Sequence, residues 1–369
     1  MRTLLVAVLA VIGYVDAGKK FSCKNMQGKD VDWFVALKLP SYVDNRKGRT
    51  FAYFDATQRE WTWSKQPINS TESAIGATVQ QLYASDNKTT FKTAYNDDVP
   101  NHLAEGSGRG HSKGVIVFGE QQGFWLVHSV PRYPSPYKYE YPDSGSIFAQ
   151  SFLCLTLPID ELEKVANYLR FSQVTPFITN RPKDFDVAAP HLVDVGEKKS
   201  LGRSDTVFTF TPVLKTVGGK KVRLFAKHKK FGRDLWHDLI ATGIHAAMAV
   251  ETWRNGAAKN VGTQCGVTGY NVYDIDVVKV ADKEYASSKD HSKWGVSMNP
   301  KVQTVCIGDV NRQESQFKRG GGALCIEDKY LWRTFFSSVY HFLNCGEVQE
   351  RKSKGKSKKG EKEDSSFAE

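Results

Sequence analysis

A short motif that occurs twice, about half a chain apart, restricts the folds open to this sequence of 369 residues. Residues 110–114 read Gly-His-Ser-Lys-Gly, and residues 290–295 read Asp-His-Ser-Lys-Trp-Gly. A third His-x-Lys, from His228 to Lys230, lacks the shared serine, and roughly one such match is expected by chance. Each His-Ser-Lys copy adjoins a predicted strand. The repeat therefore predicts a duplicated, pseudo-dimeric fold in which each half supplies one copy to a single site.

The hydrophobic pattern mixes strands and helices, which indicates an α/β or α+β fold. We expect strands at residues 33–39, 50–55, 114–118, 123–130, 147–157, 222–227, 249–253, 270–280 and 302–307. We expect helices after Pro158, at residues 234–248 and at residues 327–342. These elements form two mixed-sheet halves flanked by helices, residues 18–180 and 181–346, with the seam in the Pro-, Gly- and charge-rich stretch 180–219.

The first 17 residues have the three-part pattern of a secretory signal peptide. Arg2 precedes an apolar run at residues 4–12, and small residues follow up to Ala17. We therefore expect cleavage near Ala17 and export from the cytosol. The apolar run is too short to span a bilayer, and no later stretch is long and apolar enough to predict a membrane helix.

Export decides how the six cysteines are interpreted. None lies in a C-x-x-C pair, which argues against a zinc ribbon or a thioredoxin-type site. An even number of cysteines in an oxidising compartment predicts three disulfides, although the residues alone leave the pairing open. Asn69 and Asn87 each begin an N-glycosylation sequon in polar surroundings, which agrees with export.

The composition indicates a globular protein with an anionic partner. Hydrophobic residues make up 40% and charged residues 25%, which excludes disordered, collagenous and coiled-coil classes. The 51 basic residues outnumber the 40 acidic ones, for a net charge of +11. Part of this charge belongs to the tail at residues 347–369, a basic run with an acidic end. The tail has almost no apolar residues, so we predict that it is disordered.

Two histidines and two lysines in this arrangement suit the cleavage of a phosphodiester. Such cleavage needs a nucleophile, an acid for the leaving oxygen, and cations for the phosphoryl charge. One neutral imidazole can attack while a protonated one donates, and two ammonium groups can hold the non-bridging oxygens. No His/Asp/Glu cluster has convincing metal-ligand spacing, so we expect no metal and no other cofactor.

Stretches throughout the body resemble the deoxyribonuclease II family, acid endonucleases of lysosomes and secretions with a fold related to phospholipase D. The matching stretches are residues 31–35, 38–40, 110–114, 126–131, 225–227, 231–235, 290–294, 306–312 and 319–325. They run in order between the first and last cysteines. Together they are far more specific than any one motif.

The resemblance implies a phospholipase D-like pseudo-dimer with one active site at the interface of its halves. The implied activity is hydrolysis of double-stranded DNA, best at acid pH and without a divalent metal, leaving 3′-phosphate and 5′-hydroxyl ends. The catalytic residues implied by the matching motifs are His111, Lys113, His291 and Lys293. The implied disulfides are Cys23–Cys154, Cys265–Cys345 and Cys306–Cys325. A lysosomal or secreted location follows from the same resemblance.

One departure from the phospholipase D signature affects how the histidines are oriented. That signature continues with four residues after the lysine and then an aspartate, and at that position this chain has Phe118 and Met298. An acidic residue from elsewhere must orient the histidines, and Asp309 is our candidate. The remaining candidates are His128 and Asn311 as supports of the site and Lys227, His228, Lys230 and Arg312 as contacts to DNA phosphates.

Two other functions compete with a deoxyribonuclease. A secreted phosphodiesterase acting on phospholipid or RNA would use the same chemistry, but a lipid hydrolase gains nothing from a basic body. A nucleic-acid-binding protein without catalysis should have lost one His-x-Lys copy, and both are intact. A homodimer is plausible, and the sequence leaves it open.

Overall fold

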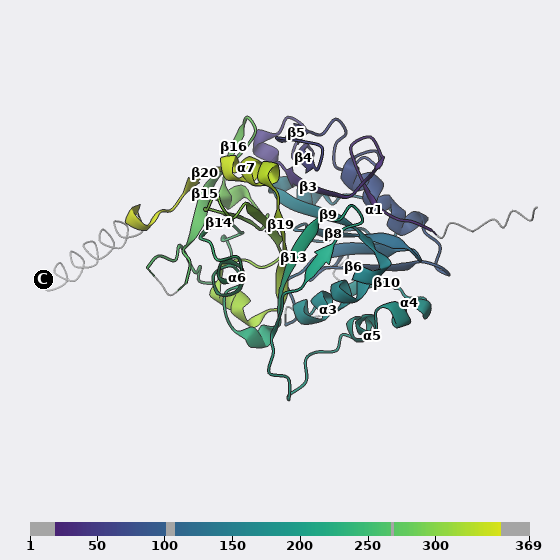
Figure 1. Ribbon diagram of the computed structural model, residues 1–369. Helices are drawn as coiled ribbons and strands as arrows, with labels where there is room; N and C mark the ends of the chain where they lie inside the picture. The colour runs from purple at the N-terminus through teal and green to yellow at the C-terminus, as the bar shows by residue number, and fades with distance from the viewer. Residues whose placement is uncertain (1–18, 101–107, 267–268, 348–369) are drawn as a thin grey trace, which may run out of the picture.

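A computed structural model describes residues 19–100, 108–266 and 269–347 of the chain. The predicted signal peptide at residues 1–17 and nearly all of the predicted tail at residues 347–369 lie outside the described residues. Within the described part, two large β-sheets pack face to face, and short helices lie around them (Figure 1). The fold is therefore mixed α/β, as the sequence pattern predicts.

The first sheet contains eight strands among the described residues. In spatial order they are β10 (Pro176–Asn180), β6 (Phe91–Tyr95), β7 (Gly114–Phe118), β8 (Gln122–His128), β9 (Gln150–Pro158), β3 (Trp33–Lys38), β4 (Phe51–Asp55) and β5 (Thr62–Trp63). A small sheet beside it pairs β1 (Cys23–Lys24) with β2 (Asp30–Val31).

The second sheet is built from the later part of the chain. Its main path is β11 (Thr209–Phe210), β13 (Lys221–Lys227), β19 (Gly321–Glu327), β18 (Thr304–Gly308), β17 (Trp294–Ser297), β14 (Met248–Glu251), β15 (Val272–Val280) and β16 (Lys283–Ala286). Two strands lie off this path: β12 (Val213–Lys215) pairs with β13, and β20 (Val339–Phe342) pairs with β15.

Five strands of each sheet follow the same plan. The antiparallel path β6-β7-β8-β9-β3 in the first sheet corresponds to β14-β17-β18-β19-β13 in the second. In both paths, the second strand begins directly after a His-Ser-Lys motif. This equivalence supports the interpretation of the chain as two related halves, while the boundary at residue 180 stays a prediction.

Short helices join the strands and cover the sheets. The α-helices are α1 (Ala74–Ala84), α2 (Asp143–Ile147), α3 (Leu162–Ser172), α4 (Asp184–Ala188), α5 (His191–Gly196), α6 (Thr242–Ile244) and α7 (Lys329–Ser338). The 3-10 helices are η1 (Ser41–Val43), η3 (Ile159–Glu161), η4 (Lys229–Phe231), η6 (Ser287–Lys289) and η7 (Glu314–Lys318), and η5 (Trp236–Ala241) is a π-helix. None of the helices within the described ranges is long and apolar enough to cross a membrane.

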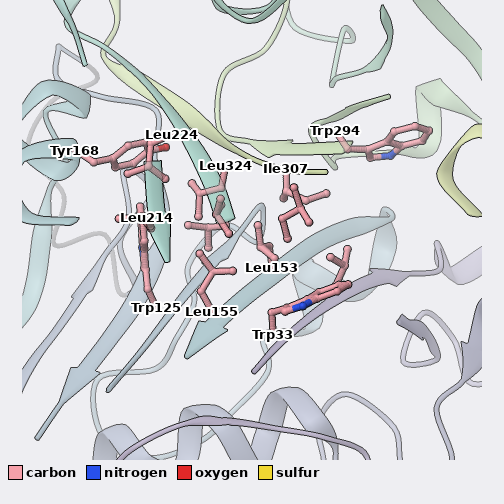
Figure 2. Close-up of a cluster of buried hydrophobic side chains, with 14 of the residues drawn as sticks. Trp33, Trp125, Leu153, Leu155, Tyr168, Leu214, Leu224, Trp294, Ile307 and Leu324 are labelled. Atoms are coloured by element: carbon pink, nitrogen blue, oxygen red, sulfur yellow. The ribbon is translucent and has the colours of Figure 1, made fainter. Parts of the chain in front are cut away.

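The largest hydrophobic core lies between the two sheets. Figure 2 shows Trp125, Leu153 and Leu155 of the first sheet packed toward Leu224 and Leu324 of the second. Alternate residues of the same strands face outward into two smaller cores, one under α1 and one under η5. Each sheet is thus covered on both faces, which explains why its strands read as nearly continuous apolar runs.

Three disulfides staple this framework, and the described residues contain no free cysteine. They are Cys23–Cys154, Cys265–Cys345 and Cys306–Cys325, the pairs that the family resemblance implies. The first holds the N-terminal strand against β9, and the last joins the neighbouring strands β18 and β19.

Two predicted helices are shorter than expected. The helix predicted at residues 234–248 is interrupted because it forms the π-helix η5, and His245 then turns into a left-handed conformation with φ 55°. The helix predicted at residues 327–342 ends at Ser338. Its last residues instead form β20, because they find a hydrogen-bonding partner in β15.

Candidate active site

Each His-Ser-Lys motif is anchored on the opposite half of the molecule. The backbone N–H of His111 donates to the Gly320 carbonyl at 2.9 Å, and that of His291 donates to the Ala149 carbonyl at 2.9 Å. Gly320 directly precedes β19, and Ala149 directly precedes β9, which are equivalent strands. This reciprocal exchange brings the two motifs together at the interface of the sheets.

Charged groups of the two motifs affect one another's pKa values. Burial and the neighbouring charges of Lys293 and Lys113 hold the pKa of His291 well below its usual range. Burial lowers the pKa of Lys293 to about 7, and Lys113 is the main charge that adds to this effect. Both lysines are almost completely buried. The structure therefore concentrates positive charge in a space shielded from solvent, as a phosphoryl group requires.

His111 lies in a charged clamp. Its Nδ1 is 2.7 Å from Oδ2 of Asp97 and 2.9 Å from a terminal nitrogen of Arg319. Arg319 also donates to Asp97 at 2.9 Å, and Lys113 forms an ion pair with the same carboxylate. Burial would raise the pKa of Asp97, but His111, Lys113 and Arg319 together hold it well below its usual range.

The same clamp determines what the imidazole of His111 can do. Burial lowers its pKa to about 3, although the Asp97 carboxylate works in the opposite direction. The Nδ1 atom of His111 is occupied by its contacts with Asp97 and Arg319. The other ring nitrogen, Nε2, is buried and has no hydrogen-bond partner among the described residues. That nitrogen is the one left for a substrate.

His291 has different neighbours. Its Nδ1 lies 3.1 Å from the carbonyl oxygen of Ser129 and 3.2 Å from Nζ of Lys293. A carbonyl only accepts and an ammonium only donates, so Nδ1 bonds to Ser129 when it carries a hydrogen and to Lys293 when it does not. The ring also packs against Trp253, with ring centroids 5.2 Å apart, and Trp253 packs against Phe148 at 4.7 Å.

A buried lysine braces the loop beside each motif. Nζ of Lys227 donates to the carbonyls of Gln316, Phe317 and Arg319, at 2.6–3.1 Å. Lys38 occupies the equivalent position at the end of β3 and donates to the carbonyls of Ser146 and Phe148. Both side chains are fully buried, and burial lowers the pKa of Lys38 to about 7 and that of Lys227 to about 8.

Three of the four predicted contacts to DNA phosphates are structural instead. Lys227 is the brace just described, and all its observed acceptors are backbone carbonyls of the protein. Arg312 is fully buried and forms ion pairs with Asp234 and Asp274. His228 is also buried, with its Nε2 2.8 Å from the Ser200 hydroxyl. Lys230 is exposed and donates to the Gly202 carbonyl at 2.6 Å, so its role stays a prediction.

The predicted supporting residues are all buried, but one of them has different contacts from those expected. The carboxylate that contacts His111 belongs to Asp97, whereas Asp309 lies 3.3 Å from the Tyr168 hydroxyl. Burial raises the pKa of Asp309 to about 7 against the opposing effects of Ser112 and Lys113. Neutral His128 accepts from the backbone N–H of Val130 at 3.2 Å, and Asn311 is buried.

Sequence reasoning missed Asp97 and Trp253 as neighbours of the histidines, and Phe148 as the ring that packs against Trp253. Asp97 follows a strand that carries no motif, and the signal available was its place in Asn-Asp-Asp directly after the apolar pattern of residues 91–95. Trp253 lies at the end of a predicted strand and looks like a core residue. No three His, Cys, Asp or Glu residues cluster as metal ligands within the described ranges.

Comparison with known proteins identifies the class and then the family. The deoxyribonuclease II family model matches residues 22–345. Cell-death-related nuclease 7 of Caenorhabditis elegans is 42% identical over 346 residues, which cover 94% of this chain and 93% of that protein. Deoxyribonuclease-2 of the same organism is 32% identical over 365 residues (89% and 96%), and Deoxyribonuclease-2-alpha of Mus musculus is 31% identical over 356 residues (94% and 99%). The chain is thus a nuclease. It belongs to the deoxyribonuclease II family.

Proposed function

We propose that this protein is an acid endodeoxyribonuclease that hydrolyses double-stranded DNA without a metal ion, through His111, Lys113, His291 and Lys293. The observation that carries the proposal is the reciprocal anchoring of the two His-Ser-Lys motifs, each through the backbone of the opposite half. This arrangement offers two imidazoles and two buried ammonium groups to one phosphate.

His111 is the nucleophile in this mechanism. Its low pKa keeps the imidazole neutral at acid pH, which a nucleophile requires. With Nδ1–H donated to Asp97, the Nε2 lone pair attacks phosphorus and forms a phosphohistidine, and the Asp97 carboxylate stabilises the positive charge that develops on the ring. Lys113 and Lys293 balance the charge on the non-bridging oxygens.

His291 is the general acid that protonates the leaving 5′ oxygen, which yields 3′-phosphate and 5′-hydroxyl ends. In the substrate-free protein, burial and Lys293 disfavour its protonated form. The negative charge of a bound phosphodiester offsets these lysine charges and raises the pKa of His291. His291 is therefore protonated when the substrate binds, and a low ambient pH favours this protonation. Water then hydrolyses the phosphohistidine, with His291 acting as the base.

The proposed setting is a lysosome, the degradation of DNA from engulfed cells, or a secretion. An acid compartment supplies the proton that His291 needs, and the disulfides fit an exported protein. The signal peptide near Ala17 and glycans on Asn69 and Asn87 belong to the same proposal. Both asparagines are exposed, as a glycan requires.

Plasmid nicking at pH 5 with EDTA tests the proposal. The wild type should convert supercoiled plasmid to open circles, and His291→Ala should not. The nicked ends should accept a phosphate from polynucleotide kinase without prior phosphatase treatment, because the 5′ ends carry hydroxyls. Absence of nicking by the wild type in EDTA, with nicking restored by Mg²⁺, would overturn the two-histidine mechanism. Cleavage of RNA but not DNA would overturn the substrate.

A further inference from the structure

Trp253 packs against His291, and Phe148 packs against Trp253, at the two positions where the first motif has charged side chains. Trp253 lies two residues beyond β14, whose last residue, Glu251, pairs with Trp294. Asp97 lies two residues beyond β6, whose last residue, Tyr95, pairs with Gly114. Because Gly114 and Trp294 each follow the motif lysine, Trp253 is the structural counterpart of Asp97.

Phe148 is likewise the counterpart of Arg319. Each directly precedes the residue whose carbonyl accepts from the motif histidine, Ala149 for Phe148 and Gly320 for Arg319. The carbonyls of Phe148 and Arg319 are both held by the equivalent buried lysines, Lys38 and Lys227. The molecule thus repeats one backbone frame and replaces a charged pair with an aromatic pair.

The hydrophobic cores do not account for this aromatic pair. Neither Phe148 nor Trp253 is a member of the three apolar clusters formed by the described residues, and both rings keep part of their surface exposed. They contact each other in an edge-to-face arrangement, with an interplanar angle of 69°. Trp253 also contacts the ring of His291, a catalytic candidate. The pair is therefore an apolar wall of the site.

We propose that Phe148 and Trp253 form a stacking site for a nucleobase displaced from the DNA duplex on the 3′ side of the cleaved bond. This inference rests on the proposed function, because it uses His291 as the acid for the leaving 5′ oxygen. The nucleotide that carries that oxygen lies on the 3′ side of the bond, next to His291 and hence next to the aromatic wall.

The buried position of the catalytic atoms gives the physical reason for displacing a base. Nε2 of His111 has less than 1 Å² of accessible surface, so a regular stacked duplex must deform to bring phosphorus to it. Unstacking a base costs free energy, and stacking the freed base on aromatic rings offsets this cost. Such stacking requires no particular DNA sequence, because every base has a flat face. The brace from Lys38 holds Phe148 in place for this contact.

The test compares Trp253→Ala with the wild type on two duplexes that each contain one cleavable phosphodiester among phosphorothioates. One duplex is intact, and the other has an abasic tetrahydrofuran residue on the 3′ side of the cleavable bond. On the intact duplex, Trp253→Ala should raise KM roughly tenfold or more, the usual effect of losing an aromatic–base contact. On the abasic duplex, the two proteins should have similar KM values.

Trp253→Phe should recover most of the lost affinity, since a phenyl ring still stacks. Tyr137→Ala is the matched control, because Tyr137 is an aromatic side chain with 80% exposure elsewhere on the surface. An equal loss for Trp253→Ala on both duplexes, expressed mainly in kcat, would overturn the inference and make Trp253 a support for the His291 ring. A wild type that cleaves neither duplex, nor plasmid, would refute the proposed function itself.

Discussion

The two His-Ser-Lys sites share a backbone and differ in what touches the imidazole. His111 contacts Asp97 and Arg319, whereas His291 contacts the Ser129 carbonyl and the Trp253 ring. The shared frame includes the strand order, the cross-half backbone hydrogen bond and the lysine brace. The difference shows that a duplicated backbone can place two identical residues in different surroundings, and the proposed mechanism assigns them different roles.

The contrast extends to the residue that follows β8 and β18. Ser129 occupies this position in the first half and Asp309 in the second, since their backbone N–H groups donate to the equivalent residues Ser151 and Gly322. Asp309 is electrostatically coupled to Lys113, so the first motif has acidic groups on two sides. His291 has no such carboxylate among its hydrogen-bond partners in the described residues.

Removal of either imidazole is the strongest way to break the comparison. His111→Ala and His291→Ala should each lower kcat by about 10⁴-fold or more, because each variant lacks one of the two imidazoles that the reaction uses. Residues that act as one unit have effects that are not additive. The double variant should therefore be little worse than either single one. Initial rates of plasmid nicking at pH 5 measure the effect. Two independent losses that multiply would show that the motifs act at separate sites.

Replacement of the lysines tests whether the two motifs share one phosphate. Lys113→Met and Lys293→Met should each lower kcat by roughly 10²- to 10³-fold, the usual cost of removing one donor to a developing charge. Single-turnover cleavage measures this loss. Lys229→Met is the control, because Lys229 is exposed and lies in the third His-x-Lys, which lacks the shared serine. A loss of kcat in only one of the two variants would mean that the two lysines do not share the phosphate, although the backbones of the two motifs are equivalent.

Asp97→Asn tests the charged clamp that distinguishes His111. The variant should lose roughly tenfold to hundredfold in kcat with little change in KM, since the amide no longer stabilises the charged ring. Because the folded pKa of Asp97 is depressed, its ionised form stabilises the fold above pH 3.8, and this stabilisation is lost as the pH falls toward the folded pKa. The difference in Tm between wild type and variant should shrink accordingly below pH 3.8. A pH-independent difference would contradict the charge argument.

The sequence predicted the shared frame better than the differences within it. The strands and the His-Ser-Lys copies have local signatures, because apolar periodicity and a repeated tripeptide can be read along one segment. The contacts of Asp97 and Arg319 with His111, and of Trp253 with His291, depend on which loops meet, and no local pattern encodes that. The same limit explains why Lys227 and Arg312 were predicted to contact DNA phosphates. In the sequence both look like free cations, but in the structure both bond to residues distant along the chain.

Asp309→Asn should give the smallest effect and the most specific one. Burial raises the pKa of this carboxyl from 3.8 to about 7, so it is mostly neutral at pH 5 and becomes a carboxylate beside Lys113 as the pH passes 7. The asparagine is neutral at every pH. We therefore expect similar rates at pH 5 and a variant about threefold more active than the wild type at pH 7.5, measured as full pH–rate profiles.

The pH dependence of stability is a second measure of the Asp309 carboxyl. Between pH 3.8 and about 7 the folded protein keeps a proton on Asp309 that the unfolded chain releases, so the contribution of this group to stability falls as the pH rises. Asp309→Asn should remove that part of the slope of Tm against pH. Asp98→Asn, which replaces a half-exposed carboxyl, is the control for general charge effects. Parallel pH–rate profiles for Asp309→Asn and the wild type would show that the carboxyl of Asp309 does not set the alkaline limit of activity, and would leave His291 as the group that does.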